Sequence, residues 1–329
     1  MKTKMLKSAL GFMVGVLLAI GATSCDSDDP VNNGQGKNGE ETASKMIVPA
    51  RVEISIYEGH LHGVKKFHQN THAKELKYLG TNYKLVYELK GNKWVASPEN
   101  KTVTILADPT KGGATAVDIH YFDKDNHEIT GRYITGGENQ HYQHFFIAED
   151  IRSGYGDIDK REVSNGSDFF DYEYCDTDPW NETNHSGRAK FVDAPLAVGM
   201  KGYFHFLVPY KRFNLEVRLM RSENNKLTDG KPSPFYAPTE QQIAKAEWLP
   251  SIVIPVNLYL STADLELEAD DYDNEVILTR DESEFSEHDR RVIHTLMDAF
   301  GETDFHKGVA EFFWNIVGSG GHDMDNFWF

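Results

Sequence analysis

Short runs of alternating apolar and polar residues recur along most of this chain, and they constrain its fold more than any other feature. Successive side chains of a β-strand point to opposite faces, so this alternation predicts strands with one buried and one exposed face. Short strands separated by turn residues are typical of antiparallel sandwiches. We therefore predict a mainly β protein built from two antiparallel, Ig-like β-sandwich units. The clearest runs are residues 51–57, 83–89, 102–106, 116–122, 202–208, 213–219 and 252–260.

The predicted strands fall into two groups. The 329 residues are enough for two ordinary domains, and 40% apolar with 12% aromatic residues can form a substantial core. Residues 152–187 are rich in Gly, Asp, Asn and Ser, which indicates a domain junction or a long functional loop. We therefore expect one β-sandwich unit over residues 46–152 and a second β-rich unit over residues 153–280.

The last fifty residues change from strand-like to helical patterning. Ser286 can cap a helix that Gly301 ends, and a second helix is expected from about Thr303 to Gly318. Most amphipathic helices bury their apolar stripe on their own domain rather than on a partner. Residues 281–329 are therefore expected to form a helical hairpin packed on the neighbouring β unit, followed by an aromatic tail. The apolar positions at helical spacing are Val292, Ile293, Leu296, Met297 and Phe300, then Phe305, Val309, Phe312, Phe313 and Ile316.

The first residues are not expected to belong to the fold. Three lysines precede an apolar run over residues 9–21 that is too short to span a membrane as a helix, so residues 1–24 are predicted to be an export signal. Small residues then precede Cys25, and acidic residues follow it. This stretch resembles a bacterial lipobox, with Ala22 where a leucine is more common, followed by the acidic signal that sends lipoproteins of the Bacteroidota to the cell surface.

The resemblance implies that Cys25 is diacylated and anchors the protein to the outer membrane, exposed at the cell surface. Residues 25–45 are polar and Gly-rich, so we expect them to be a flexible tether between the lipid and the fold. Once Cys25 is acylated, Cys175 is the only other cysteine, and no intramolecular disulfide can form. The formal charge is −17, and losing the three lysines with the signal brings it to about −20, which argues against nucleic acid as a partner.

Four of the fourteen histidines lie within the thirteen residues from His60 to His72. Imidazole is the commonest protein ligand for borderline transition metals. His60 and His62 would point the same way on a strand, about 6.6 Å apart. We predict that the chain turns at Gly63 and returns, so that His60, His62, His68 and His72 converge on one zinc, copper or nickel ion.

Three further residues are candidates for the same site. Glu58 can supply an extra oxygen ligand or accept a hydrogen bond from a ligating histidine. His141 and His144 can complete the site if their loop folds back over the cluster. Haem is the main variant of the hypothesis, because an iron porphyrin needs one or two axial histidines and cations for its propionates, which Lys65 and Lys66 can supply.

Motifs for catalysis are missing from the sequence. It has no HExxH helix, no Gly-x-Ser-x-Gly turn, no Gly-rich phosphate loop and no spaced cysteine pair, so we expect a binding protein and not an enzyme. The leading hypothesis is capture of a transition metal or haem for a TonB-dependent outer-membrane transporter. One alternative is a glycan-binding surface lipoprotein and another is an adhesin or fimbrial subunit. The aromatic residues that could hold a sugar are Trp180, Tyr210, Phe235, Tyr236 and Trp248.

Overall fold

The computed structural model describes residues 45–70, 77, 82–108, 110–153, 161–260, 265, 276–319, 327 and 329. The predicted export signal, Cys25 and nearly all of the tether lie outside these residues, and so does His72. Among the described helices, none has both the length and the apolar character needed to cross a membrane.

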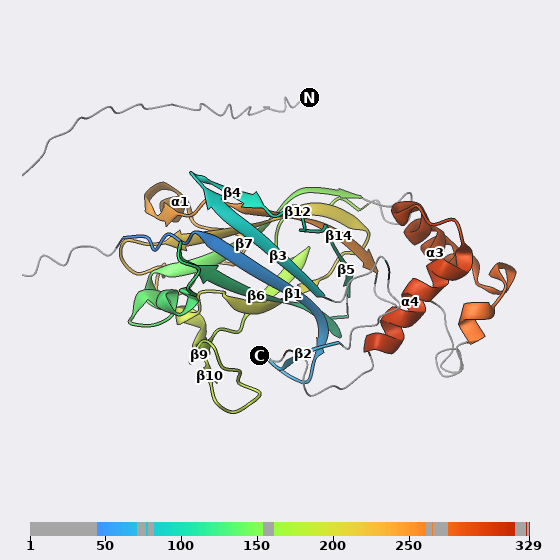
Figure 1. Ribbon diagram of the computed structural model, residues 1–329, viewed down its shortest axis with the longest axis horizontal. Helices are drawn as coiled ribbons and strands as arrows, with labels where there is room; N and C mark the ends of the chain where they lie inside the picture. Colours follow the sequence, from blue (N-terminus) through green and yellow to red (C-terminus); the bar gives the residue numbers. More distant parts are fainter. Residues whose placement is uncertain are drawn as a thin grey trace, which may run out of the picture. The chain divides into compact units, whose positions relative to one another are not determined.

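The protein is mainly β, with 39% strand and 19% helix, as the alternating sequence predicted. Two large sheets hold most of the described strands, which pair antiparallel except for one parallel pair, β5 and β14 (Figure 1). The larger sheet runs in the order β4 (Lys93–Ala96), β3 (Asn82–Lys90), β1 (Arg51–Leu61), β6 (Gly113–Phe122), β11 (Lys201–Phe206) and β8 (Phe170–Tyr174), with β2 (Phe67–Gln69) also paired to β1. The smaller sheet runs β13 (Glu247–Trp248), β12 (Lys211–Arg221), β14 (Ile252–Leu260) and β5 (Val103–Ala107), with β7 (Tyr142–Ser153) also paired to β12.

The remaining elements are short. A separate ribbon is formed by β9 (Thr177–Asp178) and β10 (Lys190–Phe191). The 3-10 helices are η1 (Thr130–Tyr133), η2 (Glu138–Gln140), η3 (Ala194–Leu196), η5 (Val276–Thr279) and η6 (Glu282–Glu284), and the α-helices are α1 (Glu240–Lys245), α3 (Glu287–Phe300) and α4 (Phe305–Ser319).

The main core lies between the two sheets. Ile54 and Ile119 of the larger sheet and Leu215 and Ile254 of the smaller sheet belong to the same buried cluster, each with at most 2% of its surface exposed. The apolar positions of the alternating runs therefore form the inward face of each strand, as in a sandwich.

The predicted division at residue 152 does not correspond to the way the strands pair. β6 pairs with β11, β7 with β12 and β5 with β14, so each sheet takes strands from both predicted ranges. Residues 43–329 accordingly cluster as one unit. Alternation shows which side of a strand is buried but contains no information about its partner.

The alternating residues 116–122 and 128–134, with turn residues between them, predict a β-hairpin, but only its first half is a strand. Its first half is β6, but its second half forms the 3-10 helix η1 after a single bridge between Phe122 and Glu128. The Thr130 side chain accepts a hydrogen bond from the Tyr121 amide at 2.8 Å, and the Tyr133 side chain is fully buried. A side-chain acceptor thus replaces the strand that the alternating pattern predicted.

The C-terminal helices form the predicted hairpin. The Ser286 side chain caps α3 by accepting from the Asp289 amide at 3.1 Å, and Gly301 ends the helix in the left-handed region at φ 69°. Apolar residues of both helices share one buried cluster with Tyr210 and Tyr259, and Tyr259 belongs to β14. The hairpin therefore packs on its own β structure, as expected.

Candidate metal centre

A tight hairpin between β1 and β2 carries the histidine-rich stretch. The His62 amide donates to the Lys66 carbonyl at 2.9 Å, and the Lys66 amide donates to the Gly63 carbonyl at 3.1 Å. Gly63 has φ 134° and Lys65 has φ 58°, so the turn takes place where the sequence predicted it. The register pairs His60 with His68 directly across the two strands. Because side chains alternate along a strand, His60, His62 and His68 all lie on one face of the hairpin.

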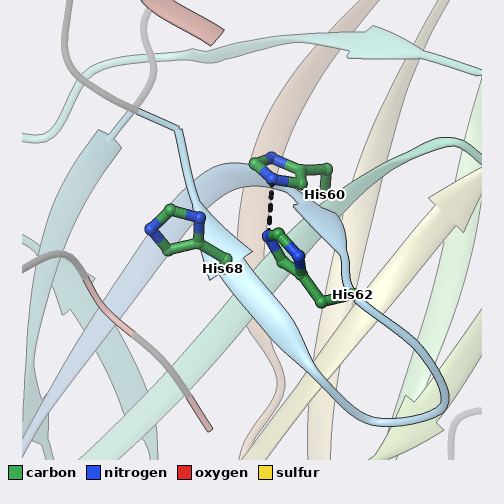
Figure 2. Close-up of side chains that lie close together, drawn as sticks. All are labelled: His60, His62 and His68. Carbon is green, nitrogen blue, oxygen red and sulfur yellow. Dashed lines mark hydrogen bonds between the residues drawn. The ribbon is translucent and has the colours of Figure 1, made fainter. Parts of the chain in front are cut away.

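The three imidazoles converge on one another (Figure 2). Each of His60, His62 and His68 offers one ring nitrogen, and these nitrogens lie within 4.8 Å of one another. The Nε2 atoms of His60 and His62 are 3.0 Å apart. Ligand atoms around a tetrahedral zinc ion lie about 3.3 Å apart, given Zn–N bonds of about 2.0–2.1 Å, so the rings need only small rotations to share an ion.

Exposure differs among the three rings. His68 is fully buried, His60 is half-buried and His62 is exposed. The centre therefore has one deep ligand and opens to solvent on the His62 side. Three imidazoles are the protein ligand set of one class of zinc site, and nitrogen-rich sites also suit copper and nickel.

Asn70 fixes the proton on His60. Its side-chain oxygen lies 2.8 Å from His60 Nδ1, and its backbone N–H donates to the backbone carbonyl of Glu58 at 2.9 Å. A carbonyl oxygen can only accept, so Nδ1 carries the proton and the lone pair of His60 is left on Nε2, which faces His62. The sequence reasoning missed Asn70, although it stands two residues after His68 in extended backbone and so falls on the same face.

Glu58 lies deeper along β1, on the same face as His60, and is 8% exposed. Its carboxylate is not one of the ligand atoms within 4.8 Å of one another, so it is not grouped with them as a further ligand, and its role as a hydrogen-bond acceptor for a ligating histidine stays a prediction. Across the sheet, His60 pairs with Gly113 of β6. A Cβ atom on Gly113 would meet the Asp108 carboxylate at 3.4 Å, so the Asp108 side chain lies beside this position.

The structure places His141 and His144 elsewhere, so these possible additional ligands do not complete the centre. His144 is fully buried in the main core, where its Nε2 lies 2.9 Å from the hydroxyl of Tyr121. Tyr121 is eight residues along β6 from Gly113, which pairs with His60, and that separation is about 26 Å at the rise of a strand. His141 Nδ1 bonds the Ser222 carbonyl at 3.1 Å. Both residues belong to the start of the β7 region, which pairs into the smaller sheet.

Other candidate residues serve the fold. Cys175 is fully buried, and burial raises the pKa of its thiol, which fits an inert cysteine. A second group of possible ligands, Asp123, Asp125 and His127, stands in a turn, where the Asp123 carboxylate accepts the amides of the other two residues. Of the aromatic residues considered for sugar binding, Trp180 and Tyr210 are less than 9% exposed. These two rings cannot form a sugar platform, whereas Phe235, Tyr236 and Trp248 are half-buried, and the glycan alternative stays a prediction.

Comparisons with protein-family models, with curated proteins and with solved structures found no match to this chain. The β1–β2 hairpin is the part of the described chain whose geometry points to a function. Its most informative feature is that the imidazoles of His60, His62 and His68, which come from a stretch of nine residues, meet on one face of two paired strands.

Proposed function

We propose that this protein binds one transition-metal ion through His60, His62 and His68, and that its role is binding and not catalysis. The observation that supports the proposal is the convergence of three ring nitrogens within 4.8 Å. Neutral imidazole nitrogens suit zinc, copper and nickel, whereas calcium and magnesium prefer oxygen ligands. Asn70 holds the tautomer of His60 that leaves Nε2 able to ligate.

The geometry favours a bare ion over haem. Two histidines that ligate one haem iron must stand on opposite faces of the porphyrin. The Nε2 atoms of His60 and His62 are 3.0 Å apart, which leaves no room for a macrocycle between them. Haem could use only one ring of the cluster, whereas a single ion uses all three.

The proposed location follows from the N-terminal sequence. Diacylated Cys25 would hold the protein on the outer face of the outer membrane, with residues 25–45 as the tether. There the exposed His62 side of the centre would face the medium and could pass the ion to a TonB-dependent transporter. This role requires the ion to exchange, and the exposure of His62 gives a competing ligand access to that side of the centre.

Metal titration of the untagged chain from residue 26 onward tests the proposal. We expect zinc, copper or nickel to bind at one ion per chain, measured by calorimetry and by elemental analysis after dialysis. The single variants His60→Ala, His62→Ala and His68→Ala should each weaken binding at least tenfold, because each removes one of three ligands. His141→Ala is the matched control and should bind like the wild type, since His141 lies outside the cluster.

Two results would contradict the proposal. One is a wild-type chain that takes up none of the three ions in stoichiometric amount. The other is binding that all three cluster variants retain at full strength, which would move the site to other residues.

A further inference from the structure

Two aromatic residues near the end of the sequence dock on the hairpin, on the face opposite the imidazoles. Phe327 stacks on Tyr57 with ring centroids 4.6 Å apart and planes 15° apart. Phe329 is 2% exposed, and its ring centroid lies 5.4 Å from that of Phe67. Tyr57 is three residues from His60 on β1, and Phe67 is one residue from His68 on β2. Both separations are odd, so the two rings lie on the face opposite the imidazoles. Phe327 and Phe329 are called the aromatic segment below.

The aromatic segment also bonds to the backbone of β2. The backbone N–H of Gln69 donates to the backbone carbonyl of Phe327 at 3.0 Å, and the backbone N–H of Phe327 donates to the side-chain oxygen of Gln69 at 3.2 Å. The His185 amide donates to the Phe329 carbonyl at 2.8 Å. β2 is three residues long, and β1 is its strand partner among the described residues, so the segment supplies backbone bonding on its other side.

The backbone and the Phe67 ring of β2 pack in close contact with Gly59 of β1. A Cβ atom added to Gly59 would lie 2.2 Å from the His68 carbonyl oxygen and 2.4 Å from the ring of Phe67. The Phe67 ring therefore lies directly on the β1 backbone, and the Phe329 ring lies against Phe67. His68 stands between Phe67 and Gln69, the two residues of β2 that the segment contacts.

We propose that the aromatic segment is a positioning element of the metal centre: it holds β2 against β1, and so keeps the His68 ring beside His60 and His62. The inference rests on the proposed function, because it concerns the same three ligands. A three-residue edge strand without this support would fray, and His60 and His62 would remain as a two-nitrogen chelate. Groups that orient metal ligands are typically worth 10–100-fold in affinity.

The coupling acts in both directions. If docking of the segment favours metal binding, metal binding favours docking by the same factor. An ion on one face of the hairpin therefore stabilises contacts of Phe327 and Phe329 on the other face, although neither residue offers a metal ligand.

Zinc titration of the double variant Phe327→Ala/Phe329→Ala tests the inference. We expect affinity to fall about 10–100-fold. Phe312→Ala is the matched control, because Phe312 is 2% exposed but packs among the C-terminal helices, and its zinc affinity should match the wild type. In a His68→Ala background the double variant should cause no further loss, because the segment acts through His68. A purely structural role would lower affinity equally in both backgrounds.

A spectroscopic readout separates positioning from general destabilisation. The Cu²⁺ complex of the wild type should show three coordinating imidazole nitrogens in electron spin-echo spectra, and the double variant should show two. In the wild type, zinc should slow hydrogen exchange of the Gln69 amide, which donates to Phe327. If the wild type binds zinc and the double variant binds it equally well with three nitrogens, the inference fails while the proposed function stands. If the wild type binds no ion, both fail.

Discussion

His144 should make the folded protein sensitive to mild acid. Its side chain is fully buried, with its ring stacked between those of Tyr121 and Phe146. Burial lowers the pKa of His144 to about 3. The unfolded chain has an ordinary histidine pKa of about 6.5, so it binds a proton that the folded chain excludes. The contribution of neutral His144 is therefore complete above pH 6.5 and is lost as the pH falls from 6.5 towards 3.

The size of the effect follows from the difference between the two pKa values. Each pH unit below 6.5 costs about 1.4 kcal/mol until the folded pKa is reached, so the loss between pH 7.5 and 5.0 is about 2 kcal/mol. His120 acts in the opposite sense in the upper part of this range: hydrogen bonds to Asp118 and Glu128 outweigh its burial and raise its pKa to about 9, so its contribution grows as the pH falls to about 6.5 and is constant below that. This contribution is the same in the wild type and in a His144 variant. His205, whose pKa burial lowers, adds a loss of the same sign.

Chemical denaturation at pH 7.5 and 5.0 isolates His144 when the wild type is compared with His144→Gln. A glutamine oxygen can accept the Tyr121 hydroxyl but does not titrate. We expect the free energy of unfolding of the wild type to fall about 2 kcal/mol further than that of the variant. Equal pH dependence in the two proteins would refute the reasoning. Zinc affinity should be unchanged in the variant, because His144 lies about 26 Å along the sheet from the hairpin.

Three further predictions concern other parts of the protein. Gly59→Ala should weaken zinc binding at least tenfold in calorimetry, because its Cβ would push the His68 backbone away from β1. In alkaline denaturation series, the wild type should lose about 1–2 kcal/mol relative to His120→Gln as the pH rises through about 9, since the raised pKa of His120 stabilises the fold only while the ring is protonated. Asp176→Asn should lower the free energy of unfolding by about 3–5 kcal/mol, because the buried carboxylate accepts the amides of residues 198–201, and the loss is measurable in urea.

The strands could be predicted because their signal is local. In β1, the inward positions from Val52 to Ile56 are buried and the alternate ones are not, which is the pattern the sequence displays. Gly91, at φ 63°, likewise marks the turn between β3 and β4 locally in the sequence. The pairing of β5 with β14 could not be predicted, because it joins residues about 150 positions apart and depends on which faces bury together. The same limitation produced the division into two β units.

The candidate site, too, could be predicted only where its residues are close together in the sequence. His60, His62 and His68 lie within one hairpin, so their spacing and the glycine at position 63 were enough to predict that they meet. Strand alternation also contained the warning against His141 and His144, since residues three apart on a strand face opposite sides. Nothing local connects Phe327 with Gln69, which are 258 residues apart, so their contact needed the structure.

The alternation that builds the sandwich also explains why the metal centre needs support. His60 and His68 share a face only in the observed register, and a slip of one residue would turn one ring to the opposite side. A three-residue strand fixes its register weakly through its own ladder, whereas bonding to Phe327 on its free edge and packing of Phe67 on Gly59 oppose any slip. The two faces of the hairpin therefore have separate roles: the outer face holds the register, and the inner face uses it to bring the imidazoles together.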